Sequence, residues 1–402
     1  MPEFFRVVRF EEARALVEAC CPPRRPQEVA LADSVGRVLA RDVTSREDVP
    51  AFERSTVDGY AVRARDTFGS SEALPGYLAL VGEVLMGEAT ALALGQGECA
   101  WVPTGGMMPA GADAVVMVEH TELLGDDTVL VLRPVGPGEN VIRVGEDARA
   151  GERVLEAGRR LRPQDVGVLA ALGQERVEVL APLRFGIVST GDEVVPVDQE
   201  PRIGQVRDIN SHALAAAVRQ HGGIPHRYGI IPDEEAQLRR GLARALAEND
   251  VVVISGGSSV GTRDLTLEVL LSLPEAELLF HGVAARPGKP TMAVRAGQKL
   301  LLGLPGHPVA ALMMFRLLGA PLLDAGGWQE VRAVMASNVA SQAGRDDFVR
   351  VELSGEGAVP VATPLYGKSG LMLLMARAHG FVHVPYEKQG IAAGEEVPVV
   401  LF

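Results

Sequence analysis

Residues 183–320 alternate short apolar runs with longer stretches in which apolar residues recur every three or four positions. The apolar runs, such as 251–254, are rich in β-branched residues and predict strands that are buried on both faces. The periodic stretches predict helices, two of which take Asn210 or Ser211 and Asp233 as N-caps. Strands that alternate with helices are typical of a mostly parallel sheet covered by helices on both faces.

The flanking regions have β patterns instead. Residues 74–135 contain short strand-like runs separated by Gly and Asp, which predict a small barrel or sandwich. Residues 328–402 contain further strand-like runs and predict a second β domain. Helical periodicity predicts helices over 10–21 and 31–39, and a third helix that begins at Pro163.

A loop of small residues joins a predicted strand to a predicted helix in the stretch VVVISGGSSVGTRD, 251–264. Its small residues would let backbone N–H groups and a helix N-terminus approach an anion. These residues are Ser255, Gly256, Gly257, Ser258 and Gly261. Asp264 adds a carboxylate, which indicates a cation between it and the anion. The alternative is a Gly-rich turn that binds nothing, and this stretch alone does not decide between them.

Three more polar loops follow predicted elements of this domain: STGDE (189–193), RPGKP (286–290) and LPGH (304–307). Because ligands of open α/β sheets bind at the carboxyl ends of the strands, we expect these loops to form one site with 255–264. Arg286 and Lys289 supply positive charge there. Glu193 and Asp264 supply carboxylates that can share a divalent cation with a phosphate. The sequence therefore predicts a site for a phosphorylated small molecule.

Three other polar features have an ordinary structural explanation when each is taken alone. Asp58 begins an Asp-Gly pair that suits a tight turn. The Thr104-Gly-Gly segment suits a hairpin connection, although its backbone amides can also bind an anion. The segment around Ser369 is a further possible anion loop, and Arg345 and Arg350 are more simply explained as surface cations.

The composition excludes several classes of protein. The chain has 402 residues, of which 47% are hydrophobic and 23% charged, as in folded globular proteins. A net charge of −13 and an aromatic content of 4% disfavour nucleic acid as a partner. Cys20, Cys21 and Cys99 have neither disulfide nor zinc spacing and suit a reducing cytoplasm. The N-terminus does not resemble a signal peptide, and the apolar run 309–323 is too short to span a membrane. We expect a cytoplasmic protein.

Motifs along nearly the whole chain match a known family in order: PAFERSTVDGYAV, PTGGMMPAGADAVVMVE, GEDARAGERVLEAGRRLRPQDVGVLAALG, STGDE, SGGSSVG, RPGKP, LPGHP and GKSG. The chain thereby resembles the molybdopterin molybdenumtransferases of the MoeA type, to which the C-terminal part of gephyrin also belongs. Molybdopterin adenylyltransferases share the S-G-G and L-P-G loops. The loop at 49–63 and the flanking β domains distinguish the MoeA type from them.

The resemblance implies a multidomain α/β plus β fold. Its expected domains are a central molybdopterin-binding α/β domain with a mostly parallel sheet (182–327), an inserted small β-barrel-like domain (46–140), an elongated, discontinuous N-terminal domain (1–45 plus 141–181) and a C-terminal β domain (328–402). It also implies a homodimer, with the site between the 182–327 domain of one subunit and the 46–140 domain of the other.

The resemblance further implies that molybdenum from molybdate is inserted into adenylylated molybdopterin, with Mg²⁺ as cofactor and release of AMP. The residues at catalytic positions are Asp58, Thr104, Glu193, Asp233 and Asp264, and the metal ligands are Glu193 and Asp264. The residues expected to bind the substrates are Ser189, Thr190, Gly191, Asp192, Ser255, Gly256, Gly257, Ser258, Gly261, Arg286, Pro287, Gly288, Lys289, Pro305, Gly306, His307, Arg345 and Ser369. Transient contacts with a molybdopterin adenylyltransferase and with molybdoenzyme chaperones are also expected.

Some positions depart from the family pattern. Arg286 stands where the family usually has Lys, which changes a point charge into a planar fork. His307 stands where it usually has Asn, and Glu53 and Val57 replace the usual Asp (or Asn) and Met near Asp58. These departures leave the rate and the choice between molybdate and tungstate open.

Two other functions compete with this interpretation. One is a nucleotidyltransferase that acts on molybdopterin itself, which would consume ATP and would leave the 46–140 and 328–402 domains without a role. The other is a non-catalytic molybdopterin carrier or scaffold. The acids at 58, 193, 233 and 264 favour catalysis over a carrier, because a carrier has less need of carboxylates near an anion.

Overall fold

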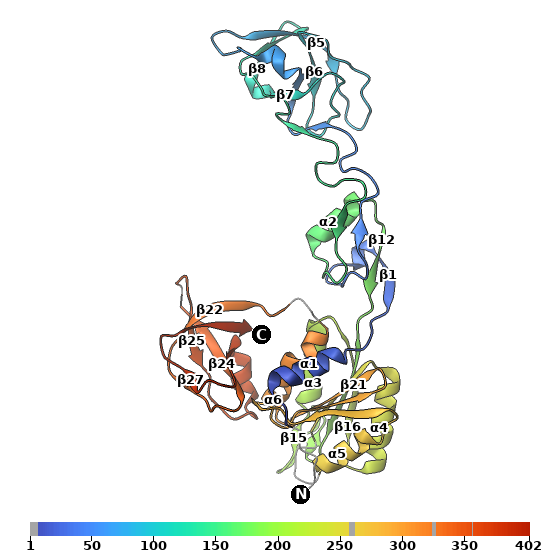
Figure 1. Ribbon diagram of the computed structural model, residues 1–402, viewed down its shortest axis with the longest axis vertical. Coiled ribbons are helices and arrows are strands. Elements are labelled where there is room, and N and C mark those ends of the chain that lie inside the picture. The colour runs from blue at the N-terminus through green and yellow to red at the C-terminus, as the bar shows by residue number, and fades with distance from the viewer. Residues whose placement is uncertain (1–6, 257–261, 324–326, 356) are drawn as a thin grey trace. The chain divides into compact units, whose positions relative to one another are not determined.

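The structure, a computed structural model, describes residues 7–256, 262–323, 327–355 and 357–402, and the side chains of 262–264 lie outside the description. The chain separates into two compact units (Figure 1). Unit 1 comprises Met1–Pro26 and Leu180–Phe402, and unit 2 comprises Gln27–Val179. The finer division of the chain into four domains stays a prediction.

A six-stranded sheet forms the centre of the α/β part of unit 1. Its strands, in spatial order, are β16 (Ile224–Ile231), β13 (Arg184–Thr190), β17 (Val251–Ser255), β21 (Lys299–Leu304), β20 (Met292–Ala296) and β18 (Ala276–His281). The first four pair in parallel, whereas β20 is antiparallel to both of its neighbours. The predicted mostly parallel sheet is confirmed, and the polar loops after β13, β17 and β21 leave it at one edge.

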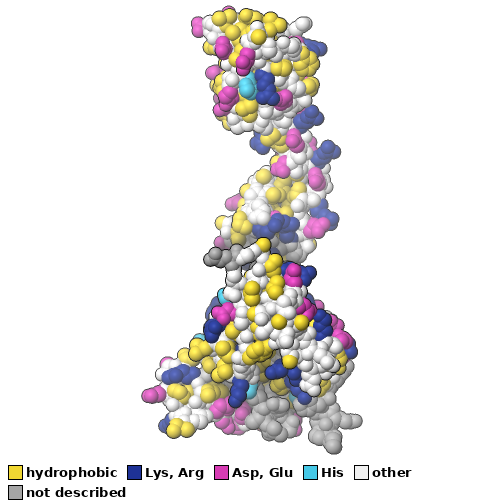
Figure 2. Space-filling view, turned by 90° about the vertical axis from the view of Figure 1, so that its left-hand side faces the viewer, with side chains coloured by type: hydrophobic (Ala, Val, Ile, Leu, Met, Phe, Trp, Pro, Cys, Tyr) yellow, Lys and Arg dark blue, Asp and Glu magenta, His cyan; other side chains and the backbone are white. Residues whose placement is uncertain are grey.

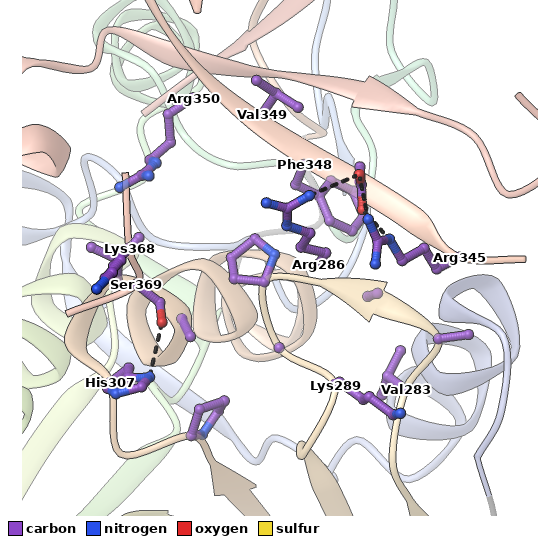
Figure 3. Close-up of a pocket in the computed structure, with 18 of the residues that line it drawn as sticks. Val283, Arg286, Lys289, His307, Arg345, Phe348, Val349, Arg350, Lys368 and Ser369 are labelled. Carbon is purple, nitrogen blue, oxygen red and sulfur yellow. Dashed lines mark hydrogen bonds and ion pairs between the residues drawn. The ribbon is translucent and has the colours of Figure 1, made fainter. Parts of the chain in front are cut away.

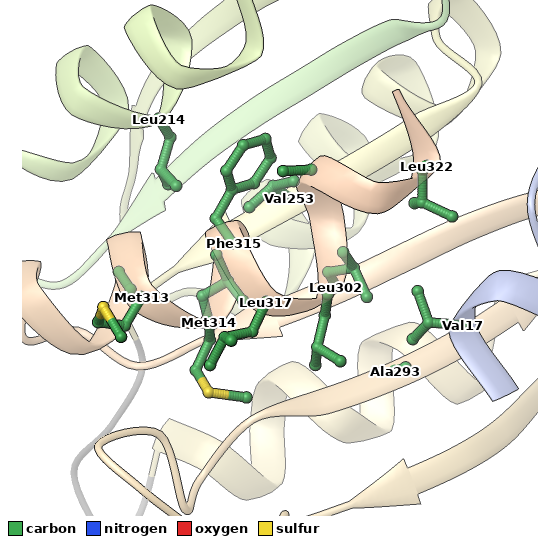
Figure 4. Close-up of a cluster of buried hydrophobic side chains, with 14 of the residues drawn as sticks. Val17, Leu214, Val253, Ala293, Leu302, Met313, Met314, Phe315, Leu317 and Leu322 are labelled. Atoms are coloured by element: carbon green, nitrogen blue, oxygen red, sulfur yellow. The ribbon is translucent and has the colours of Figure 1, made fainter. Parts of the chain in front are cut away.

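Helices cover both faces of this sheet (Figure 1). They are α1 (Phe10–Ala19), α3 (Asn210–Gln220) and α6 (Pro308–Met314) on one face, and α4 (Glu235–Glu248) and α5 (Thr262–Leu271) on the other. Successive strand residues point to opposite faces, so Val253 and Leu302 pack in one apolar cluster (Figure 4). Val252 and Leu301 pack in the other cluster. The sheet is therefore buried on both faces, as its β-branched strands predict.

Helix α1 packs in the core of unit 1, although residues 1–45 are predicted to form one domain with 141–181. Phe10, Ala13 and Val17 recur on one face of the helix and are all buried in the first apolar cluster. The ring of Phe10 also packs edge-on against Phe348, with 4.9 Å between the ring centroids. The helix thereby connects the start of the chain to both the α/β part and the C-terminal part of unit 1.

The residues predicted as helix caps make no cap hydrogen bonds with their side chains. Helix α3 begins after Ile209 and α4 after Glu234. Asp208 acts at the start of α3 instead, because its carboxylate accepts hydrogen bonds from the amide of Ser211 at 3.1 Å and from the hydroxyl of Ser211 at 2.6 Å. The cap predictions for Asn210, Ser211 and Asp233 are therefore wrong.

The C-terminal part of unit 1 contains a closed five-stranded barrel. Its strands, in order, are β24 (Asp346–Ser354), β25 (Val361–Pro364), β22 (Glu330–Met335), β28 (Glu396–Leu401) and β26 (Gly380–Val384), which pairs back with β24. Helix α7 (Met372–Arg377) and the pair β23 (Val339–Ala340) and β27 (Gly390–Ile391) complete this part. The short strand β19 (Ala285–Arg286) leaves the α/β part and pairs in parallel with β24. The predicted C-terminal β domain is thus confirmed.

Unit 2 contains another six-stranded sheet. Its strands, in order, are β7 (Ala114–Met117), β4 (Gly59–Val62), β6 (Glu98–Val102), β5 (Gly76–Glu83), β9 (Thr128–Val131) and β8 (Thr121–Leu124). Val62 and Cys99 are buried in a cluster on one face, whereas Ala61 and Ala100 are buried in a cluster on the other. Two apolar cores on one sheet agree with the small β domain that the sequence predicts.

The remainder of unit 2 is built from short elements. They are the strand pairs β1 (Pro26–Ala30) with β12 (Arg176–Leu180), β2 (Val43–Thr44) with β11 (Arg153–Leu155) and β3 (Arg54–Ser55) with β10 (Val141–Ile142), and helix α2 (Pro163–Ala171). The predicted helix over 31–39 is wrong, because only one 3₁₀ turn, Leu31–Asp33, forms there. Gly36 has a φ of 75°, which a continuing helix does not allow.

Among the described residues, no helix is both long and apolar enough to cross a membrane. On the face shown in Figure 2, the Lys and Arg side chains are interspersed with the Asp and Glu side chains. On this face, neither the acidic nor the basic side chains gather in one large patch.

Replacing Phe10 by Ala should lower the free energy of unfolding of unit 1 by about 3–5 kcal/mol, because it removes a buried ring from the apolar cluster. The measurement is urea unfolding followed by the fluorescence of Trp328 in a Trp101→Phe background. Glu12→Ala, an exposed change in the same helix, is the control and should cost no more than about 1 kcal/mol. Equal effects of the two changes would contradict the packing described for α1.

Candidate functional site

A cavity of about 990 Å³ lies between the α/β part and the barrel of unit 1 (Figure 3). Its lining from the α/β part includes predicted site residues, namely Arg286, Pro287, Gly288, Lys289, Pro305 and His307. The lining from the C-terminal part includes Arg345, Asp347, Arg350, Lys368 and Ser369. The cavity therefore contains five Lys or Arg side chains and one carboxylate, a balance that suits an anionic ligand.

The loop that carries Arg286 and Lys289 has a constrained backbone. The Arg286–Pro287 peptide bond is cis, and Gly288 has a φ of 116°. A side chain at Gly288 would overlap with the sulfur of Met314, so only glycine fits there. The hydroxyl of Thr291 donates to the carbonyl of Gly288 at 2.6 Å and closes the turn. This geometry aligns the loop with the cavity.

Asp347 neutralises part of the positive charge at one end of the cavity. Its carboxylate is almost fully buried and accepts hydrogen bonds from Arg345 at 2.9 and 3.4 Å and from Ser341 at 3.0 Å. Arg286 lies 3.9 Å from the same carboxylate (Figure 3). Arg345 is thereby held rigidly by its partner, whereas the more exposed Arg286 keeps donors for a ligand.

Arg350, which the sequence alone explains most simply as a surface cation, lines the cavity. It is only 8% exposed, and its sole protein acceptor in the described chain is the carbonyl of Gly367, at 3.3 Å. Its Nη1 atom is buried without a hydrogen-bond partner among the described residues. Burial lowers the pKa of its guanidinium. A buried cation without a carboxylate is costly, so Arg350 is poised to bind an anion.

Ser369 and His307 form a pair at the same end of the cavity as Arg350 and Lys368 (Figure 3). The distance between the Ser369 hydroxyl oxygen and His307 Nδ1 is 2.9 Å. Among the described residues, Lys368 has no ion-pair partner and neither has Lys289. The site therefore offers free ammonium groups, a guanidinium and a hydroxyl to an oxyanion.

A second group of predicted residues lies at the ends of β13 and β17, outside the lining of this cavity. Ser189 pairs with Ser255 across the two strands, and the Ser189 hydroxyl donates to Asp208 at 2.9 Å. Within the described chain, the buried hydroxyl oxygens of Thr190 and Ser255 lack hydrogen-bond partners. They are consequently available to a ligand.

Glycines allow close backbone approach in this second group. Gly256 has a φ of 120°, and a side chain on it would overlap with the carbonyl oxygen of Thr190. Gly306 is connected to the start of α3, because its carbonyl accepts a hydrogen bond from the amide group of Asn210 at 2.8 Å. The structure thus brings the ends of β13, β17 and β21 to one edge, and of the described residues that follow these strands, Pro305 and His307 after β21 line the cavity.

Acidic residues gather near the loop after β13. Burial, together with the carboxylates of Asp192 and Glu193, raises the pKa of Asp233. A side chain on Gly191 would lie 2.7 Å from a carboxylate oxygen of Glu193, so this turn is tight. Within the described part of the chain, no three His, Cys, Asp or Glu side chains form a group able to hold a metal ion.

Four predicted residues cannot be compared with the structure. Gly257, Ser258 and Gly261 lie outside the described residues, as does the side chain of Asp264. The predicted metal pair of Glu193 and Asp264 therefore stays a prediction.

Asp58 and Thr104 lie together in unit 2. The backbone amide of Thr104 donates to Oδ1 of Asp58 at 2.7 Å, and the Thr104 hydroxyl donates to the same oxygen at 2.9 Å. These two hydrogen bonds, the amide first, hold the pKa of Asp58 below its usual range. Asp58 is thus an exposed, ionised carboxylate that is fixed in position.

These features define a protein with a candidate anion site between an α/β part and a β-barrel. Residues 8–173 match the MoeA N-terminal region (domain I and II), 186–325 a probable molybdopterin binding domain, and 332–402 the MoeA C-terminal region (domain IV). The chain belongs to the MoeA family.

Full-length relatives agree with this assignment. The chain is 32% identical to the molybdopterin molybdenumtransferase of Bacillus subtilis, over 93% of this chain and 90% of the relative. It is 30% identical to the enzyme of that name from Haemophilus influenzae, over 98% of this chain and 99% of the relative. A crystal structure of the molybdopterin biosynthesis MoeA protein from Pyrococcus horikoshii superposes with a TM-score of 0.86 at 33% identity and covers 99% of this chain and 100% of that one.

Replacing Arg350 by Met should leave the free energy of unfolding unchanged or raise it by up to about 2 kcal/mol, because it removes a buried charge without a carboxylate partner. The same change should weaken binding of inorganic molybdate at least about tenfold, measured by calorimetry. The control is Arg332→Met, an exposed change outside the cavity, which should leave molybdate binding as it is. A loss of stability without a loss of binding would refute the role given to Arg350.

Replacing Thr104 by Val should raise the pKa of Asp58 toward its usual range, because the hydroxyl donor is lost and only the amide donor remains. The measurement is a carboxyl-carbon NMR titration of Asp58. Thr104→Ser keeps a hydroxyl and should leave the pKa low. If Asp58 has the same pKa in the Thr104→Val and Thr104→Ser variants, the hydroxyl does not stabilise the ionised carboxylate.

Proposed function

We propose that this protein inserts molybdenum from molybdate into adenylylated molybdopterin and releases AMP. Relatives that it matches over more than nine tenths of its length carry the name molybdopterin molybdenumtransferase. The observation that carries the proposal is the buried Arg350 beside the 990 Å³ cavity, without a carboxylate partner in the described chain. Burial of a guanidinium without a carboxylate partner costs free energy, and a bound anion would offset this cost.

The side chains of the cavity suit both a molybdate ion and a phosphate. Arg350, Lys368 and Ser369 offer charged and neutral donors at one end, and Lys289 offers an ammonium group between the two parts of unit 1. Donors fixed before the reaction stabilise negative charge as it develops on the phosphate that leaves. The step that they would assist is attack of water on the diphosphate of the substrate, in which a P–O bond to the water oxygen forms as the P–O bond between AMP and the pterin phosphate breaks.

The carboxylates near β13 support a requirement for Mg²⁺. Oxygen ligands suit this ion, and burial first, then the neighbouring carboxylates of Asp192 and Glu193, raises the pKa of Asp233, so that carboxylates gather where a cation would be favourable. We assign Glu193 and Asp264 as its ligands. When bound, Mg²⁺ neutralises charge on phosphate oxygens.

Unit 2 contributes the pair of Asp58 and Thr104. We assign this pair to the dithiolene and molybdate end of the substrate, as the motif match implies. We further propose that the active form is a homodimer, in which unit 2 of one subunit completes the site of the other, and that the protein works in the cytoplasm. Three cysteines without a disulfide support the location.

Purified protein with adenylylated molybdopterin, Mg²⁺ and molybdate should release AMP in proportion to bound molybdate. Lys289→Ala should lower kcat/KM about a hundredfold, because it removes one cation from the phosphate. The matched control, Arg332→Ala, removes an exposed cation outside the cavity, and its kcat/KM should stay within twofold of that of the wild type.

Other outcomes would point to the competing functions. Consumption of ATP with unmodified molybdopterin would indicate a nucleotidyltransferase. Tight binding of adenylylated molybdopterin without AMP release, with either molybdate or tungstate, would indicate a carrier or scaffold.

A further inference from the structure

A hollow of about 420 Å³ opens on the sheet of unit 2 and has no role in the function described so far. Its lining consists of Tyr60, Leu80, Gly82, Glu83 and Trp101. Two aromatic rings, an aliphatic side chain, a glycine and a carboxylate make a surface that suits a flat ring with polar edges.

The hollow lies where the parallel pairing of β5 with β6 shifts its register. Leu80 lies opposite Cys99 and Glu83 lies opposite Trp101. Between these two paired positions, β5 therefore has one residue more than β6. The extra residue makes a β-bulge, and the regular pairing resumes when the amide of Val84 donates to the carbonyl of Trp101 at 2.8 Å. Bulges of this kind redirect side chains and are common beside functional sites.

Tyr60 and Trp101 form the aromatic wall. They are cross-strand partners on β4 and β6, and their ring centroids lie 5.2 Å apart at an angle of 75°. Tyr60 is buried, whereas Trp101 is half-buried and keeps part of its indole accessible. The buried ring of Tyr60 therefore packs against the indole of Trp101, and the accessible part of the indole can contact the ring of a ligand.

Glu83 supplies the polar part of the hollow. Its carboxylate is exposed at the rim, and no hydrogen bond or ion pair joins it to another described residue. A carboxylate accepts two parallel hydrogen bonds well, as from neighbouring N–H groups on one edge of an aminopyrimidinone ring. An apolar ring has no N–H groups that could donate hydrogen bonds to this carboxylate.

We propose that this hollow binds the pterin ring of the substrate, with Trp101 against the ring and Glu83 on its amino-substituted edge. The proposal rests on the proposed function, because that function supplies the pterin. Asp58 precedes β4 directly and Thr104 follows β6 closely, so their hydrogen-bonded pair lies at the end of the strand pair that carries Tyr60 and Trp101. The sulfur-bearing end of the substrate would then point toward Asp58.

The test uses the full-length Trp328→Phe variant, because Trp101 is then the only tryptophan of the chain. Neopterin, a free pterin without phosphate, is titrated in the absence of molybdate and Mg²⁺ while Trp101 emission is followed. We expect saturable quenching, and Glu83→Gln should weaken the affinity about tenfold because a charged acceptor is lost. Glu122→Gln, an exposed change elsewhere on the same sheet, is the matched control and should bind like the parent.

The outcomes separate this inference from the proposed function. Equal quenching by AMP, or an affinity that Glu83→Gln leaves unchanged, would overturn the pterin assignment. AMP release with molybdate but no quenching by neopterin would also overturn it and would leave the transferase function standing. Selective, Glu83-dependent quenching in a protein that never releases AMP would support the pterin site and contradict the transferase function.

Discussion

The short parallel pairing between β19 and β24 is the constraint on which the candidate site depends. Ala285 and Arg286 align with Asp346 and Asp347, and the amide of Asp346 donates to the carbonyl of Ala284 at 2.8 Å. These backbone bonds join the loop of the α/β part to the barrel strand that carries Arg350. The cavity between the two parts therefore has walls that are held by regular hydrogen bonds and not by side chains alone.

The charges in this cavity are unbalanced in a way that favours ligand binding over stability. Asp347 fully engages Arg345, but the described chain offers no carboxylate to Arg350, Lys289 or Lys368. Functional sites are commonly less stable than the rest of a protein, and the remainder of the fold offsets the lost free energy of folding. The large apolar cluster around the central sheet, which α1 also joins, supplies that stability.

Periodicity predicted most elements of the α/β part, because its strands are buried on both faces and its helices have one apolar face. It failed where tertiary context decides. The sequence pattern favours a surface position for Arg350. In the structure, pairing of β24 with β26 closes the barrel, and Arg350 is buried and lines the cavity. The rule that ligands of α/β sheets bind at the carboxyl ends of the strands predicted that the loops lie together, but it does not predict that residues of the C-terminal barrel complete the cavity. The predicted helix over 31–39 failed because Gly36 turns the chain.

Under the proposed function and the proposed pterin site, each unit recognises a different part of one large substrate. Unit 1 offers cations and hydroxyls, which suit phosphate and molybdate, whereas unit 2 offers an aromatic hollow and the carboxylate of Asp58. Neither set is sufficient for a molecule that is anionic at one end and a planar heterocycle at the other. A substrate that engages both sets gains affinity from each, because the second contact forms at high effective concentration once the first is made.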